Sequence, residues 1–238
     1  MPTEWADAAA DIPVLSDKVP GQEAVLEAEP DFIYAGWESN FSPEGAGERA
    51  DLASLGVATY VSPAACKGEG RPGKLDFDEI FDEITEVGDI FGVNATEVVD
   101  SQRSTVAAIE PDDRGLSALW FSSGSDTPYV GAGLGAPQLI LETIGLENIA
   151  GDVQDTWSPF NWEAVIDANP DVIVLVDSAW GTVDKKIGVL ESNPATAQLD
   201  AVINGRYLIV PFAASEAGVR TASAAEDLAQ QLAELDLT

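Results

Sequence analysis

Short apolar runs alternate with helix-like stretches along most of the chain. Each run is rich in β-branched or aromatic residues and is bounded by turn-forming residues, which is the pattern of a buried strand. The runs are FIYAG (32–36), VATYV (57–61), SALWF (117–121), VIVLVD (172–177) and RYLIV (206–210). Because strands that alternate with helices usually form parallel sheets, the pattern predicts an α/β fold with mainly parallel sheets.

Two consecutive helices are predicted in the middle of the chain. In the stretch 76–91, apolar residues recur every three or four positions with acidic residues between them, which indicates an amphipathic helix. A second helix follows it and is ended by Pro111. We therefore expect an N-terminal lobe at residues 1–93, a connecting helix at 94–111 and a C-terminal lobe at 112–238.

One sequence pattern occurs twice. Residues 23–33 read EAVLEAEPDFI and residues 163–173 read EAVIDANPDVI, with seven of the eleven positions identical. Each copy predicts a short helix, a turn at Pro-Asp and a buried strand. A unit that recurs in both halves of a chain indicates two lobes of similar architecture. Small molecules commonly bind in the cleft between two such lobes.

The two lobes differ in how complete they are. The C-terminal lobe has three predicted strands with their crossover connections, whereas the N-terminal lobe has only two before the long helices. Two strands are few for an open parallel sheet. We therefore expect the N-terminal lobe to be truncated.

Aromatic residues gather where predicted strands end. Ligands of open parallel sheets bind beyond the carboxyl ends of the strands, and a flat conjugated ligand stacks well on aromatic rings. Arg220 lies in the loop after the last strand, and arginine pairs with carboxylate or phosphate groups. The predicted ligand-binding residues are Trp37, Phe41, Tyr129, Trp157, Trp180, Phe212 and Arg220.

Each of these residues also has a purely structural interpretation. The aromatic rings would then seal loops against the core, and Arg220 would pair with a neighbouring acid. The glycine-rich stretch 131–137 is similar to a phosphate-binding loop, but glycines alone are a weak signal and equally allow close packing of the chain. The stretch 178–188 is predicted to be a loop.

The composition argues against several kinds of chemistry. With 42 acidic and 11 basic residues the net charge is −31, which repels nucleic acid and anionic membranes. The chain has no histidine, so Ser-His-Asp triads and histidine-ligated zinc or haem are excluded. We expect no enzymatic activity, no catalytic residue, no metal site and no resident cofactor. The single cysteine, Cys66, is expected to be a buried thiol or to pair outside this sequence.

Two other functions are alternatives to a ligand-binding protein. A metal-dependent enzyme on a related two-lobed fold would need a convergent cluster of carboxylates. The candidates for that cluster are Glu38, Asp126, Asp177 and Glu216. A non-binding scaffold would keep the fold and fill the cleft with Trp37 and Trp180.

The repeated pattern E-x-x-x-x-x-x-P-D-x-I resembles a signature of bacterial substrate-binding proteins that serve iron-siderophore, haem and cobalamin importers. The stretches LILETIGLENIAGD (139–152) and NPATAQLDAVINGRYLIVP (193–211) are also similar to that family. A narrower resemblance, carried by PDFIYAGWESNFSPEG (30–45) and PFAASEAGVR (211–220), is to an actinobacterial branch proposed to bind a deazaflavin coenzyme precursor.

This resemblance implies a lipid-anchored or periplasmic receptor with two α/β lobes joined by a long helix. Such a receptor delivers a planar or chelate ligand (a siderophore, a corrinoid, haem or a deazaflavin-like molecule) to an ABC import permease at the outer face of the cell membrane. Glu23 and Glu163, at the start of the two repeat helices, correspond to the family's permease-docking glutamates, although the helix dipole alone also favours acids there. The family's usual signal peptide, lipidated cysteine and first strands are missing from this sequence.

Overall fold

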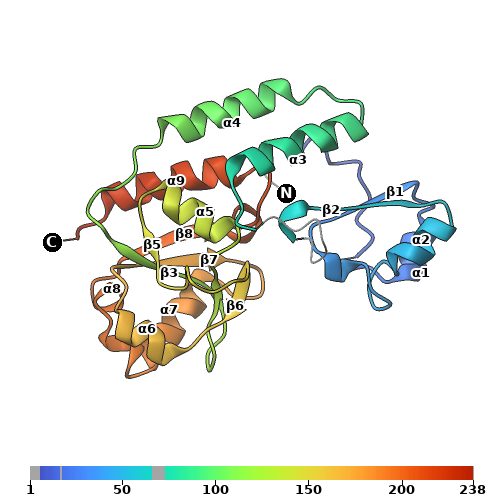
Figure 1. Cartoon of the computed structure of the whole chain (residues 1–238). Coiled ribbons are helices and arrows are strands. Elements are labelled where there is room, and N and C mark those ends of the chain that lie inside the picture. The colour runs from blue at the N-terminus through green and yellow to red at the C-terminus, as the bar shows by residue number, and fades with distance from the viewer. Residues whose placement is uncertain (1–5, 17, 66–72, 238) are drawn as a thin grey trace. The chain divides into compact units, whose positions relative to one another are not determined.

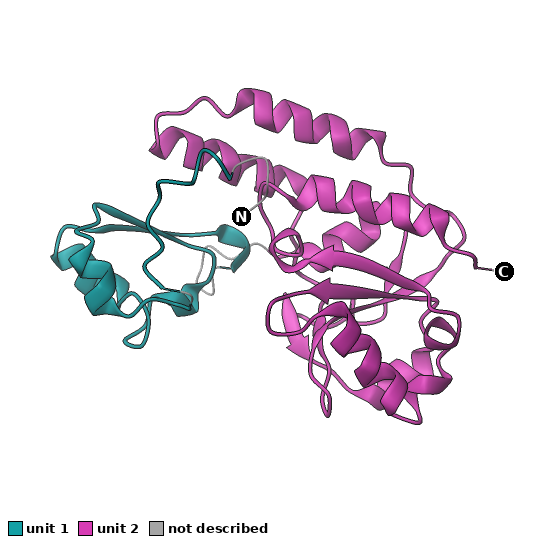
Figure 2. Ribbon diagram, turned by 180° about the vertical axis from the view of Figure 1, so that it is seen from behind, with its two compact units in different colours: residues 1–71 teal, residues 72–238 magenta. Residues whose placement is uncertain are grey.

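The computed structural model describes residues 6–16, 18–65 and 73–237. The chain forms two compact units, residues 1–71 and 72–238, which are coloured separately in Figure 2. Each unit contains a sheet with parallel strands and its own helices, so the predicted two-lobed α/β class is confirmed. Cys66 lies outside the described residues. Within these described ranges, no helix is both long enough and apolar enough to cross a membrane.

The elements follow one another as labelled in Figure 1. The elements of the first unit are α1 (Gln22–Glu27), β1 (Phe32–Ala35), η2 (Glu38–Asn40), α2 (Arg49–Ser54), β2 (Ala58–Val61) and η3 (Pro63–Ala65). The helices of the second unit are α3 (Phe77–Ile90), α4 (Thr96–Ala108), α5 (Ala136–Thr143), α6 (Trp162–Ala168), α7 (Val183–Ser192), η4 (Thr196–Gln198), α8 (Asp200–Ile203), η5 (Phe212–Ala214) and α9 (Thr221–Glu234). Its strands are β3 (Ser117–Ser123), β4 (Tyr129–Gly131), β5 (Glu147–Asn148), β6 (Trp157–Pro159), β7 (Val172–Asp177) and β8 (Tyr207–Pro211).

The first unit is built on a two-stranded parallel sheet, as the sequence predicts. Strands β1 and β2 pair from Phe32 opposite Ala58 to Ala35 opposite Val61. The buried core of this unit joins both strands to the helices α1 and α2. Its members are Val25, Ala35, Phe41, Ala46, Leu52, Val57 and Val61.

The second unit contains a six-stranded mixed sheet. Its strand order is β6-β4-β3-β7-β8, and β5 pairs with the first residues of β3. The parallel strands β3, β7 and β8 are the three that the sequence predicts, whereas β4 and β6 are antiparallel additions at one edge. Each of these two added strands is only three residues long, so no alternating pattern marks them in the sequence.

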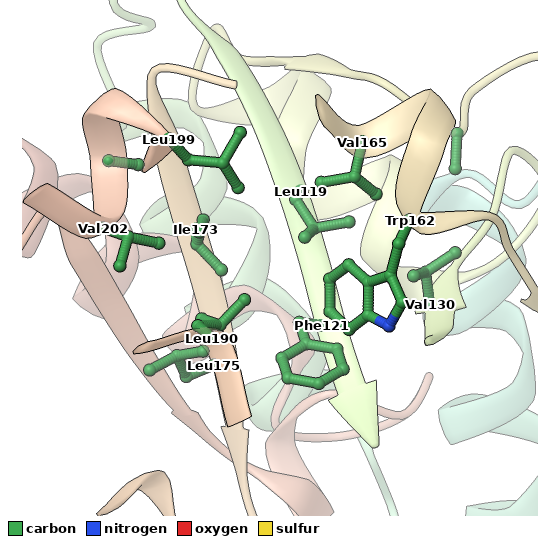
Figure 3. Packing of buried hydrophobic residues seen from close by; sticks show 12 residues of the cluster. Leu119, Phe121, Val130, Trp162, Val165, Ile173, Leu175, Leu190, Leu199 and Val202 are labelled. Carbon is green, nitrogen blue, oxygen red and sulfur yellow. The ribbon is translucent and has the colours of Figure 1, made fainter. Parts of the chain in front are cut away.

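Successive side chains along the strands point to opposite faces of the sheet, and both faces are buried. Leu119 and Phe121 of β3 and Ile173 of β7 pack with the helices α6, α7 and α8 in one cluster, shown in Figure 3. The Trp162 ring meets Phe121 edge-on with 5.4 Å between ring centroids, and its indole N–H donates to the Ser125 carbonyl at 2.7 Å. The opposite face is covered by α5 and α9 (Figure 1).

The two long helices in the middle of the chain group with the second unit. Helix α3 contacts α4, and α4 contacts α9, so the compact grouping divides the chain after residue 71. The predicted helices are present as α3 and α4. Asp76 caps α3 by accepting a hydrogen bond from the Glu79 N–H at 2.9 Å, while the Asp76 N–H donates to the Glu79 carboxylate.

Helix α7 replaces part of a predicted loop. The stretch 178–188 was expected to be irregular, but α7 begins at Val183. Its buried residues are Leu190 and a lysine, Lys186. A buried lysine in place of an apolar residue hides the helical period, which explains why the pattern predicts a loop.

The outer edge of the sheet is closed by a side chain. The Gln231 amide group on α9 accepts from the Ile209 N–H at 2.7 Å and donates to the Ile209 carbonyl at 2.9 Å. On the same strand, the Tyr207 N–H donates to the Gly205 carbonyl, and Pro211 has no N–H. The three residues that alternate along this outer side of β8 therefore offer no N–H to a further strand.

The sequence repeat is also a conformational repeat. Glu29 and Asn169 occupy the same position in the two copies, and both have a left-handed backbone, with φ of 47° and 42°. Among the described residues they are the two non-glycine positions with positive φ. In the first copy this turn follows α1 and leads the chain into β1. In the second copy it follows α6 and leads into β7, so the repeat encodes a helix-turn-strand unit.

Replacing each turn residue by glycine should have opposite effects. Glycine relieves left-handed strain, so Glu29→Gly should stabilise the first unit by about 0.5–1 kcal/mol. Asn169→Gly should destabilise the second unit by about 1–2 kcal/mol because the Asn169 side chain donates to the Asp200 carboxylate at 2.7 Å and accepts from the Asp200 N–H. Hydrogen exchange of peptides from each unit measures both effects. Equal signs at the two sites would contradict this account.

Candidate ligand-binding site

The carboxyl ends of the parallel strands β3, β7 and β8 lie at the same end of the sheet in the second unit. These three strands are parallel neighbours, so the loops that follow them emerge side by side. The loops are residues 124–128, 178–182 and 212–220. We call this end of the sheet, together with its loops, the strand-end face. Four of the predicted ligand-binding residues of this unit lie in these loops or at the adjoining start of β4.

Trp180 is presented at the tip of a short hairpin after β7. Ser178 and Gly181 form a β-bridge, with each N–H donating to the other's carbonyl. The buried Lys186 ammonium of α7 also donates to the Gly181 carbonyl. Burial lowers the pKa of Lys186, and the nearby Asp177 carboxylate opposes that shift. These contacts fix the hairpin while the Trp180 side chain stays 60% exposed.

Trp180 and Phe212, which the sequence analysis predicts as ligand contacts, are in direct contact. Their ring centroids are 4.5 Å apart and the ring planes meet at 74°, an edge-to-face arrangement. The two rings come from the loops after neighbouring strands, β7 and β8. Together they form an apolar surface on which a flat ligand can stack.

Arg220 holds the loop after β8 in shape. It stands at the start of α9, and its guanidinium Nε donates to the Ala213 carbonyl at 2.9 Å. Near it, the Thr221 hydroxyl donates to the Glu216 carbonyl at 3.3 Å and accepts from the Gly218 N–H at 3.0 Å. The Arg220 side chain is half-buried. Arg220 is therefore fixed in the same loop as Phe212.

The loop after β8 reaches the far side of the sheet. Although β8 is at one edge, the Glu216 side chain interacts with Trp157 of β6 and Tyr129 of β4 at the other edge. Trp157 is buried, and its indole N–H favours the ionised form of Glu216, whereas Tyr129 is 40% exposed. This loop therefore connects all the aromatic residues predicted for this unit.

Glu216 is the most perturbed acid of the strand-end face. Burial raises the pKa of Glu216 to about 7, and the hydrogen bond from Trp157 only partly opposes this. Burial, with the charges of Asp155 and Glu216, also raises the pKa of the Tyr129 phenol. At neutral pH a large share of Glu216 is thus a neutral carboxylic acid.

The glycine-rich stretch 131–137 serves packing. A Cβ on Gly133 would lie 1.9 Å from the Gly151 carbonyl oxygen, and one on Gly131 would lie 2.3 Å from the Pro137 side chain. The N–H groups of Ala132, Gly133 and Leu134 all donate to backbone carbonyls of residues 153–156. These amides already have acceptors, so the loop is not arranged to hold a phosphate.

The predicted residues of the first unit have two different environments. Phe41 is buried in the core of that unit, with the Arg49 guanidinium 5.7 Å from its ring centroid. Trp37 follows β1 and is half-buried, and its backbone N–H donates to the Asn40 side-chain oxygen at 3.2 Å. Phe41 therefore supports the loop that carries Trp37, and Trp37 is the more accessible of the two.

Glu23 and Glu163 have equivalent local positions. Each is exposed in the first turn of its repeat helix, α1 or α6. The Glu163 N–H donates to the Asn161 side chain, which caps α6. Both carboxylates are available to a partner surface.

The candidate cluster of carboxylates for a metal-dependent enzyme has no geometric support. In the described part of the chain, no three Asp, Glu, Cys or His side chains converge as a metal site. Glu216, one of the four candidates, is instead paired with Trp157. Sequence reasoning placed Glu216 at a strand end but did not select it as a ligand-face residue, because its burial depends on strands β4 and β6, which carry no clear sequence pattern.

Replacing Glu216 by glutamine should stabilise the protein only at higher pH. The folded state holds the Glu216 proton up to about pH 7, whereas an unfolded glutamate loses it near 4.5. Below the lower value both states are protonated and there is no penalty. The penalty of burying the charge grows between these two pH values, because only the unfolded glutamate ionises there, and it levels off above about pH 7 at about 3 kcal/mol. Denaturant unfolding of wild type and Glu216→Gln at pH values on either side measures this. A difference in unfolding free energy between the two proteins that does not change with pH would contradict the raised pKa of Glu216.

The chain is similar to proteins of known structure over nearly its whole length. A structure of a periplasmic binding protein from Veillonella parvula has 30% identity and a TM-score of 0.84, covering 98% of this chain and 81% of that chain. An ABC-type Fe³⁺-hydroxamate transport system protein from Saccharomonospora viridis has 24% identity and a TM-score of 0.83, covering 97% and 81%. The periplasmic haem-binding protein HutB of Vibrio cholerae has 16% identity and a TM-score of 0.69, covering 94% and 86%.

A comparison with curated protein sequences finds no match. The family model described as periplasmic binding protein matches residues 2–214, which include both copies of the repeat and the strand-end loops up to Phe212. The fold and this match agree, and the chain belongs to the periplasmic binding protein family.

Proposed function

We propose that this protein is an extracytoplasmic solute-binding receptor that delivers a planar or chelate ligand to an ABC import permease. The observation that carries the proposal is the pair of Trp180 and Phe212 on the strand-end face, with Arg220 in the same loop. The exposed Trp180 ring and the half-buried Phe212 ring beside it suit stacking, and an arginine suits an anionic group on the ligand. The face contains no converging group of metal ligands among its described residues.

The ligand classes that fit are ferric siderophores, haem, corrinoids and deazaflavin-like molecules. Two proteins with similar structures are named for Fe³⁺-hydroxamate transport and for haem binding. Their sequence identities to this chain are below 25%, so they support the fold alone. The ligand classes are therefore chosen by their chemistry. All four classes combine a flat or rounded apolar surface with polar oxygen atoms. Tyr129, Trp157 and Trp37 are proposed to complete the contacts, with Phe41 supporting Trp37.

Ligand binding can be tested by thermal shift. Ferrioxamine B, haemin, cyanocobalamin and 8-hydroxy-5-deazariboflavin are the probes, because a ligand that binds only the native state raises its melting temperature. We expect at least one probe to shift the wild type. Trp180→Ala should weaken that probe's affinity by about tenfold or more, since it removes a stacking ring.

Phe91→Ala is the matched control for Trp180→Ala. Phe91 is an exposed aromatic residue after α3, 62% accessible and outside the strand-end face. It should leave the affinity unchanged. Lack of any shift with all four probes, or equal effects of the two substitutions, would count against the receptor.

Glu23 and Glu163 are proposed to contact the permease, one from each unit. Their exposure and equivalent places in the repeat support this role. The charge reversals Glu23→Arg and Glu163→Arg should leave the thermal shift with ligand unchanged and reduce ligand uptake by cells about tenfold. Glu226→Arg on α9 is the control for the added charge. Normal uptake by the double variant would remove these residues from the interface.

A further inference from the structure

Glu216 has an unusual position for an acid on the surface of a binding protein. Its Oε1 atom is buried and has no hydrogen-bond partner among the described residues. Buried polar atoms without partners are rare in folded proteins, and they are most often found where a function requires them. The loop that carries Glu216 also carries Phe212 and Arg220, so this acid belongs to the same face as the proposed ligand contacts.

The groups around the Glu216 carboxyl do not neutralise its charge. From β6, Trp157 donates a neutral indole N–H. From β4 and the loop before β6, the Tyr129 phenol and the Asp155 carboxylate face the same region, and both Asp155 and Glu216 act on the Tyr129 phenol. On its own loop, Arg220 directs its Nε to the Ala213 carbonyl. An ionised Glu216 would therefore be a largely buried charge that is stabilised mainly by a neutral indole N–H.

We propose that Glu216 selects ligands by charge: its neutral carboxyl admits a ligand that brings an anionic oxygen to the strand-end face, and its carboxylate excludes that ligand. The inference rests on the proposed receptor function and names a class of ligand for it. A neutral carboxylic acid has one O–H to donate, so it can bond an anionic oxygen, while a carboxylate has only acceptors. Arg220 and the neutral acid together then favour an anion, in a chain whose net charge of −31 otherwise repels one.

The selection should depend on pH because Glu216 changes its charge in the neutral range. Burial raises the pKa of Glu216 to about 7, so the acid is neutral in mildly acidic solution and ionised in mildly basic solution. An anionic ligand should therefore bind more tightly at the lower pH. A cationic or neutral ligand of the same shape should not show this preference.

Matched pairs of compounds test the proposal. The first pair is ferrioxamine B, which carries an ammonium group, and ferrioxamine B acylated with succinic anhydride, which carries a carboxylate. The second pair is riboflavin and its anionic 5′-phosphate. Affinities of wild type, Glu216→Gln and Glu226→Gln are measured by calorimetry at about pH 5.5 and about pH 8.5, on either side of the Glu216 transition. Glu226→Gln removes the same charge from an exposed position on α9.

We expect the anionic member of at least one pair to bind about tenfold to thirtyfold more tightly to wild type at the lower pH. Glu216→Gln should bind it with the higher affinity at both pH values, and Glu226→Gln should behave as wild type. In the absence of any compound, the Trp157 environment should change near neutral pH, giving a tryptophan fluorescence transition that Glu216→Gln lacks.

The outcomes separate the inference from the receptor function. Binding of the anionic compounds that is independent of pH, or that depends on pH equally in Glu216→Gln, overturns charge selection and leaves the receptor standing. Absence of the ligand-free fluorescence transition also overturns charge selection. Failure of all four compounds to bind at either pH, together with the lack of a thermal shift from haemin, cyanocobalamin and 8-hydroxy-5-deazariboflavin, overturns both proposals.

Discussion

The parallel pairing of β7 between β3 and β8 is the constraint on which the second unit depends. All six residues of β7 but the last are buried, and both of its edges are hydrogen-bonded. Because β3 and β8 run in the same direction as β7, the loops that follow these three strands emerge at the same end of the sheet. That geometry brings Trp180 against Phe212 and places Arg220 in the adjoining loop. The strand-end face is therefore a product of strand direction more than of any single loop.

Much of this architecture is readable in the sequence. The repeat at 23–33 and 163–173 identifies two similar helix-turn-strand units, and the positive φ of Glu29 and Asn169 shows that even the turn is shared. Uninterrupted apolar runs predicted the parallel strands because strands buried on both faces need apolar residues throughout. Rules about strand ends selected the loops that carry Trp180 and Phe212, and in the structure these two rings are in contact.

The remainder depends on long-range packing that leaves no local pattern. Strands β4 and β6 contain glycine, serine and proline and are held by their neighbours, so the sequence does not distinguish them from loops. Lys186 is buried because its ammonium group meets the Gly181 carbonyl, a contact that spacing alone does not predict. Burial raises the pKa of Glu216, and this burial arises where its loop approaches Trp157, so the chemistry of the strand-end face depends on contacts between opposite edges of the sheet.

The closed edge of β8 has a consequence for the protein at high concentration. An exposed strand edge invites another copy to add a strand, which is a common route to aggregation. Here the Gln231 amide occupies both groups of Ile209, and Pro211 has no N–H to offer. The β8 edge is thus a poor template for strand addition by another copy, because Gln231 supplies the partner groups that a neighbouring strand would otherwise supply to Ile209.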